Sequence, residues 1–171
     1  MVRSLSFVHL FVILAVGYIG GALLFRKLPA TSVEKLLAIL DARVIDGPAV
    51  GWIWPAIMMV SFIVLAYVLS LLKQSRFIVI FIGALKSVLF GLSSGYLLAS
   101  GMKLIEYAIW WFPFQFITCF LFLVYCAVLS PPFFMRMTGK RKKNTKNLAV
   151  LVVIIGIVTT LEIVIYYVLL N

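Results

Sequence analysis

Five long runs of apolar residues, separated by short polar segments, dominate the sequence. Each run has the roughly 20 residues that an α-helix needs to cross the hydrocarbon core of a bilayer. We therefore predict an all-α, multi-pass membrane protein, a bundle of five transmembrane helices. The whole chain, residues 1–171, forms one integral membrane domain, with spans at about residues 6–25, 53–72, 77–99, 104–129 and 148–170.

The segment between the first two spans has a helical pattern of its own. Thr31-Ser32-Val33-Glu34 matches a capping box, in which the Thr31 hydroxyl and the Glu34 side chain each satisfy a backbone N–H. Apolar residues follow at helical spacing, and Asp46-Gly47-Pro48 ends the pattern. This predicts a short amphipathic helix that either lies on the membrane, docks on the bundle or binds a partner.

The third span carries small residues at every fourth position: Gly83, Ser87, Gly91, Gly95 and Ala99. Such residues form a ridge along a helix and let another backbone approach closely. Four residues overshoot one turn by about 40°, so the ridge rotates by about 160° along its length. We expect either a right-handed crossing or two successive neighbours. The first span has a shorter version, Gly17 and Gly21, and we predict that the first and third spans pair.

Composition supports the membrane assignment and excludes other classes. Hydrophobic residues make up 65% of the chain and charged residues only 12%, whereas ordinary soluble domains are roughly 45–50% apolar. The formal net charge is +10, but the basic residues lie mostly between the apolar runs. This distribution indicates membrane topology and anionic lipid headgroups, and not nucleic-acid binding.

The distribution of Lys and Arg predicts the orientation. Nine lie on the side of the N-terminus and five on the opposite side, and the fifteenth, Lys86, lies within a span. The positive-inside rule then places the N-terminus in the cytoplasm and the C-terminus outside. We also expect an aromatic belt at the outer interface, formed by Trp52, Trp54, Trp110 and Trp111.

The densest basic segment of the sequence lies in the loop before the last span. It is predicted to be cytoplasmic, and we interpret it as a topology determinant that binds anionic lipid or, alternatively, as a docking site for an acidic partner. Its core consists of Lys140, Arg141, Lys142 and Lys143.

Two ionisable residues, Lys86 and Glu162, lie within predicted spans. Their expected depths from the cytoplasmic side are about 14 Å and about 21 Å at 1.5 Å per residue. Charges at such depths usually face the bundle interior, pair with each other or line a polar path. Three interpretations remain open. The two charges have a structural role, either paired with each other or each hydrogen-bonded to backbone and hydroxyl groups; they line a transport or proton path; or they contact a partner's transmembrane helix.

The fourth span contains a proline, Pro113, which removes a backbone donor and predicts a kink. Gln115 is expected either to satisfy a freed carbonyl or to belong to a site at the opened turn. Otherwise the chemistry is sparse. His9 is the only histidine, no cluster has metal-ligand spacing, and no glycine-rich phosphate loop follows a strand. We therefore predict no catalytic, cofactor or metal site, and no enzyme.

Several segments together resemble the stage II sporulation protein M family. Val16–Ala22 is similar to its first helix, Phe112–Gln115 to its proline-polar break, and Thr160–Glu162 to the glutamate of its last helix. Leu85–Leu98 is similar to its Leu-Lys-Gly core segment, although Ser87 stands where glycine is usual. The segment Lys73–Arg76 departs from the glycine- or proline-containing stretch expected between the second and third spans.

The resemblance implies a non-enzymatic scaffold in the bacterial cytoplasmic membrane. In that family's sporulation role, the protein anchors and localises peptidoglycan-degrading partners, stage II sporulation proteins D and P, during engulfment. The sequence leaves an alternative open, namely a membrane subunit or accessory component of a transport or export system. The absence of detectable inverted repeats argues mildly against a stand-alone carrier.

Overall fold

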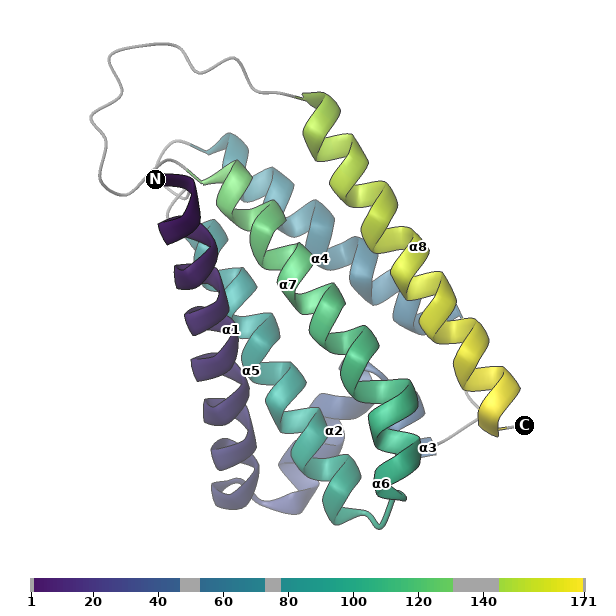
Figure 1. Cartoon of the computed structure of the whole chain (residues 1–171). Coiled ribbons are helices and arrows are strands. Elements are labelled where there is room, and N and C mark those ends of the chain that lie inside the picture. The colour runs from purple at the N-terminus through teal and green to yellow at the C-terminus, as the bar shows by residue number, and fades with distance from the viewer. Residues whose placement is uncertain (1, 47–52, 73–77, 131–144, 171) are drawn as a thin grey trace.

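The structure is a computed structural model that describes residues 2–46, 53–72, 78–130 and 145–170 (Figure 1). Every regular element in these ranges is a helix. Five helical segments are long and apolar enough to cross a membrane: Phe7–Lys27, Ile53–Leu71, Ile78–Ala99, Leu104–Leu129 and Asn147–Val168. The prediction of an all-α protein with five transmembrane helices is therefore confirmed.

Four of the spans are continuous helices, and the other is interrupted near one end. The continuous ones are α1 (Val2–Lys27), α4 (Ile53–Leu71), α5 (Ile78–Ala99) and α8 (Thr145–Leu170). The interrupted span consists of α6 (Leu104–Glu106), the π-helix η2 (Tyr107–Trp111) and α7 (Phe112–Leu129). Helices α1 and α8 begin earlier than predicted, because polar residues can continue a helix beyond the apolar run.

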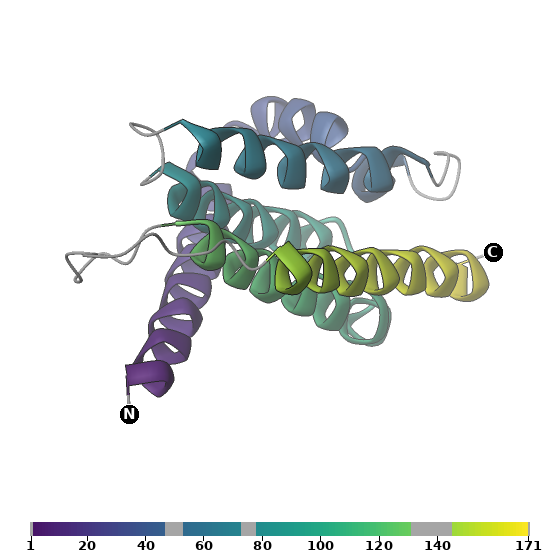
Figure 2. The ribbon, with the colours of Figure 1, turned by 90° about the horizontal axis from the view of Figure 1, so that it is seen from above.

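The helices pack around α5 and α7. The most extensive interface joins α1 to α5, followed by α5 with α7 and α7 with α8. Helix α4 has smaller interfaces with α5, α7 and α8, and it forms a separate layer when the bundle is viewed from above (Figure 2). The N-terminus of the described chain lies at one end of the bundle and its C-terminus at the other (Figure 1).

The small-residue ridge of α5 contacts two neighbours in succession, which is one of the two arrangements expected from its rotation. A side-chain carbon added at Gly83 would lie 2.7 Å from Leu123 of α7. One added at Gly91 would overlap the carbonyl oxygen of Tyr18 on α1, and one at Gly95 would meet Phe25 of α1 at 3.1 Å. The ridge ends at Ala99, which is exposed.

Helix α1 supplies the complementary surface. A side-chain carbon at Gly21 would overlap the carbonyl oxygen of Val88, and one at Gly17 would lie 2.7 Å from Ser87. Gly20 faces open space. The predicted pairing of the first and third spans is therefore confirmed, and it depends on close backbone contact, the usual basis of helix association in lipid.

The segment between α1 and α4 forms a cap on one end of the bundle. We define the cap as α2 (Ala30–Leu40), α3 (Arg43–Asp46) and the residues between them. Val33 and Leu37 are completely buried and belong to a cluster with residues of α1, α5 and α7. Of the alternatives left open by the sequence, the structure therefore has the amphipathic helix docked on the bundle.

The predicted capping box of α2 is wrong. The helix begins one residue earlier than Thr31, with Pro29 in the N-cap position, and no side chain caps it. The fixed φ of proline suits the start of a helix, and Pro29 supplies the carbonyl that accepts the first bonds, from Ser32 and Val33. The Thr31 and Glu34 side chains are consequently left exposed.

Helix α7 starts with a widened turn just before Pro113. The Phe112 N–H donates to the Tyr107 carbonyl, five residues back, which defines the π-helical turn η2. Proline has no N–H for the next bond of a regular helix, so a single wide turn accommodates it. The predicted disturbance at Pro113 therefore takes the form of a π-helical turn on its N-terminal side.

Candidate functional site

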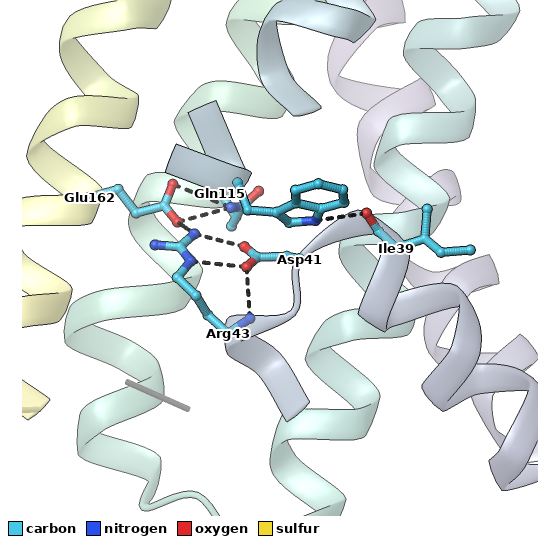
Figure 3. Close-up of polar contacts among 6 residues, drawn as sticks. Ile39, Asp41, Arg43, Gln115 and Glu162 are labelled. Atoms are coloured by element: carbon cyan, nitrogen blue, oxygen red, sulfur yellow. Dashed lines mark hydrogen bonds and ion pairs between the residues drawn. The ribbon is translucent and has the colours of Figure 1, made fainter. Parts of the chain in front are cut away.

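A buried ion-pair network joins the cap to α8 (Figure 3). Arg43 Nη2 donates to Glu162 Oε1 at 2.7 Å and to Asp41 Oδ2 at 2.7 Å, while Arg43 Nε donates to Asp41 Oδ1 at 2.9 Å. The side chains of Arg43 and Glu162 are only 1% and 2% exposed. Removal of charges from water is costly, and the several charge-assisted hydrogen bonds offset this cost.

Asp41 also determines the local backbone. Its N–H donates to the Leu37 carbonyl at the end of α2, and its Oδ1 accepts the Arg43 N–H at 3.2 Å. A carboxylate in this position caps the first turn of the following helix. Asp41 therefore ends α2, starts α3 and orients the Arg43 side chain toward α8.

Gln115 connects α7 to the same network. Its Nε2 donates to both carboxylate oxygens of Glu162, at 3.1 and 3.3 Å. The amide binds a side-chain carboxylate and not a carbonyl freed by Pro113, so the first of the two roles expected for Gln115 is not observed. The network therefore connects the cap, α7 and α8.

Two aromatic rings complete the surroundings of Arg43. The guanidinium carbon lies 5.8 Å from the Trp110 ring centroid and 5.2 Å from that of Tyr166, distances typical of cation–π contacts. Burial by itself lowers the pKa of the guanidinium, but the hydrogen bonds and charges of Asp41 and Glu162 outweigh burial and raise the pKa above its ordinary value. Arg43 therefore stays charged at physiological pH.

The belt prediction is wrong for two of its four tryptophans. Trp110 and Trp111 are 1% and 2% exposed and lie inside the bundle. The π-helical turn places both rings toward the interior, where Trp110 packs against Tyr166 at 4.5 Å between ring centroids. Trp54 is partly exposed, and its Nε1 donates to the Ile39 carbonyl of the cap at 3.0 Å (Figure 3). Trp52 lies outside the described residues.

Lys86 and Glu162 do not form an ion pair in the structure. Glu162 binds Arg43 and Gln115, and Lys86 Nζ lies 4.9 Å from the centroid of the Phe62 ring on α4. Within the described ranges, no carboxylate lies within ion-pair distance of Lys86. The four basic residues at 140–143 lie outside the described residues.

Both intramembrane charges nevertheless line the same cavity. It has a volume of about 70 Å³ and lies between α4, α5, α7 and α8, next to the cap. Its apolar side is formed largely by Met58, Met59 and Phe62 of α4. Its polar lining includes Asp41, Arg43, Lys86, Gln115, Thr118 and Glu162.

Sequence reasoning missed Arg43 and Asp41 as members of this site. It counted Arg43 only as a loop charge that determines topology. A usable signal was present, because a glutamate within a span needs a basic partner at its own depth. Glu162 is eight residues, about 12 Å, from the end of α8, and that end lies on the side of the cap.

Removal of the Gln115 amide should weaken the network without disconnecting the cap. Gln115→Leu deletes both bonds to Glu162, and hydrogen bonds to charged groups contribute about 1.5–3 kcal/mol. We expect a lower thermal unfolding midpoint in detergent. Thr160→Val is the control, because the Thr160 hydroxyl is exposed and bonds only its own helix. Equal midpoints for both variants would contradict a stabilising role of Gln115.

The fold and the site define a multi-pass α-helical membrane protein whose buried charges mainly connect structural elements. No protein-family model, curated protein or solved structure matches the chain.

Proposed function

We propose that this protein is a non-enzymatic membrane scaffold that binds other membrane proteins through its cap and the surfaces of its spans. The observation that carries the proposal is the buried network of Arg43, Asp41 and Glu162, which fixes the cap to the bundle. Both carboxylates accept hydrogen bonds from Arg43, and Glu162 also accepts them from Gln115. A surface held in this way has a defined shape, which favours recognition of a partner.

The outward face of the cap offers groups for such recognition. Glu34, Lys35, Leu36 and Ile39 are exposed along α2, while Val33 and Leu37 attach the helix from below. Apolar side chains flanked by charges are typical of binding surfaces. By the resemblance described above, the proposed partners are peptidoglycan-degrading proteins such as stage II sporulation proteins D and P, and the proposed location is the bacterial cytoplasmic membrane.

Co-purification in mild detergent tests the scaffold. We expect the tagged wild-type chain to recover cell-wall hydrolases. The double variant Glu34→Lys/Lys35→Glu should recover several-fold less, because it reverses the charges without touching the buried face. Gly20→Ala, which faces open space on α1, is the matched control. Equal recovery by the cap variant would contradict binding at the cap.

The proposed orientation places the cap outside the cell. When Arg43 is left out of the count because it is buried in an ion pair, nine Lys and Arg residues on the N-terminal side compare with four on the other. A membrane-impermeant thiol reagent should label Lys35→Cys in intact cells, and should label Asn147→Cys only after permeabilisation, since both positions are exposed. The native Cys119 and Cys126 are buried and provide the background. The reverse labelling pattern would refute the orientation.

A transport role is the second candidate, and the polar cavity favours it. Transporters bind their solutes near the middle of the membrane, in cavities between helices. Lys86→Met separates the candidates, because loss of solute flux would support transport, whereas loss of partner recruitment with an intact fold would support the scaffold. Co-purification of an ATP-binding subunit would also favour transport.

A further inference from the structure

The cavity between α4, α5, α7 and α8 contains hydrogen-bond donors that the network does not use. Trp111 Nε1 and Thr118 Oγ1 are buried and have no hydrogen-bond partner among the described residues. The Lys86 ammonium makes one side-chain contact there, with the face of the Phe62 ring. Buried polar groups are normally paired, so the Trp111 and Thr118 donors each need an acceptor. The half-buried Lys86 ammonium has no carboxylate within ion-pair distance among the described residues.

The carboxylates of the cavity are not that acceptor. Asp41 accepts three hydrogen bonds from Arg43, and Glu162 accepts one from Arg43 and two from Gln115. The hydroxyl of Thr159, also on the lining, donates to its own helix. Asp41 and Glu162 together balance Arg43 and Lys86 in formal charge, yet only Arg43 is paired with them. The unused capacity is the Lys86 ammonium, the two neutral donors and Arg43 Nη1, which also has no hydrogen-bond partner among the described residues.

We propose that this cavity binds the carboxylate group of a small organic acid. A carboxylate accepts hydrogen bonds only, and it carries the single negative charge that Lys86 can neutralise. Lys86 supplies the ion pair, and Trp111 Nε1 and Thr118 Oγ1 supply neutral hydrogen bonds. The inference is independent of the scaffold function, because none of the exposed cap residues proposed to bind a partner lines the cavity.

The volume and depth of the cavity limit the ligand. A water molecule needs about 10–15 Å³ of such space, so about 70 Å³ corresponds to roughly five waters. Formate and acetate fit this volume, whereas a bulky sulfonate does not. Lys86 is eight residues from the start of α5 and thirteen from its end, about 12 and 20 Å. It therefore lies near mid-membrane, too deep for the phosphate of a lipid headgroup.

The experiment titrates the full chain in nanodiscs of zwitterionic lipid with sodium formate or sodium acetate. Ionic strength is held constant with the sodium salt of 2-(N-morpholino)ethanesulfonate, which is too large for the cavity. We expect a saturable increase in the thermal unfolding midpoint for formate and acetate only. Lys86→Met should abolish this response and Thr118→Val should weaken binding several-fold. Lys103→Met, which removes an exposed lysine that does not line the cavity, should leave the response unchanged.

Two results would overturn the proposal. One is a wild-type response that is absent, or that is equal for acetate and the sulfonate. The other is an unchanged acetate response in a folded Lys86→Met variant. If Lys86→Met does not fold, Thr118→Val decides, since it keeps the shape of the side chain and removes only the donor. An unchanged acetate affinity in that variant, or a phospholipid or partner helix recovered in the cavity, would exclude a small-acid site.

Discussion

Replacement of Arg43 by Met is expected to destabilise the protein more than any other single substitution in the buried network. It leaves the carboxylates of Asp41 and Glu162 buried without a counter-charge, and loss of one partner of a buried pair costs about 3–5 kcal/mol. Thermal unfolding in detergent measures this loss. Limited proteolysis provides a second measurement, because a cap that detaches from α8 exposes the α2–α3 backbone.

Glu162→Gln should have a smaller effect, since the Arg43–Asp41 pair survives and the new amide still offers an oxygen to Arg43. A loss of about 1–3 kcal/mol is expected for an imperfectly satisfied buried group. Lys103→Met is the control, because its ion pair with Glu106 is on the surface and such pairs contribute about 0–1 kcal/mol. If Arg43→Met were as stable as the control, the network would not hold the cap.

Substitution of Gly21 or Gly91 by alanine is expected to separate α1 from α5. In both cases the added carbon overlaps a backbone carbonyl oxygen of the other helix, that of Val88 or Tyr18, and backbone cannot rotate away as a flexible side chain can. Overpacking of a tight contact costs about 1–3 kcal/mol. The unfolding midpoint should fall, and disulfide cross-linking of cysteine pairs placed across this interface should become slower.

The control is the neighbouring residue on the same helix. Gly20→Ala adds the same group where no atom lies within 4 Å, and alanine is favoured over glycine within a helix by about 0.5–1 kcal/mol. We therefore expect Gly20→Ala to be neutral or slightly stabilising, opposite in sign to Gly21→Ala. Equal effects at positions 20 and 21 would show that helix propensity, and not the contact with α5, decides the outcome.

The size and spacing of small residues were enough to predict that α1 and α5 lie together. The ridge at Gly83, Ser87 and Gly91 rotates around α5, and two successive neighbours were one of the two arrangements expected from this rotation. Small residues report directly on close approach, because only they permit it. The predicted capping box and aromatic belt were wrong because neither pattern is specific to one structure. A Thr-x-x-Glu sequence can lie inside a helix that begins earlier, and a tryptophan can be buried in a bundle as well as placed at an interface. Pro29 started α2 one residue earlier, and the π-helical turn placed Trp110 and Trp111 in the interior.

The ion-pair network depends on contacts between residues distant in sequence. Arg43 and Glu162 are separated by 119 positions, and no local pattern specifies their meeting. Hydrophobic length and side-chain volume are properties of single segments, so the five spans, the cap helix and the α1–α5 contact could be predicted before the fold was known. The binding of Glu162 to Arg43 and the place of Lys86 on a cavity could not, because the partner of a buried charge is whichever opposite charge the packing brings to the same depth.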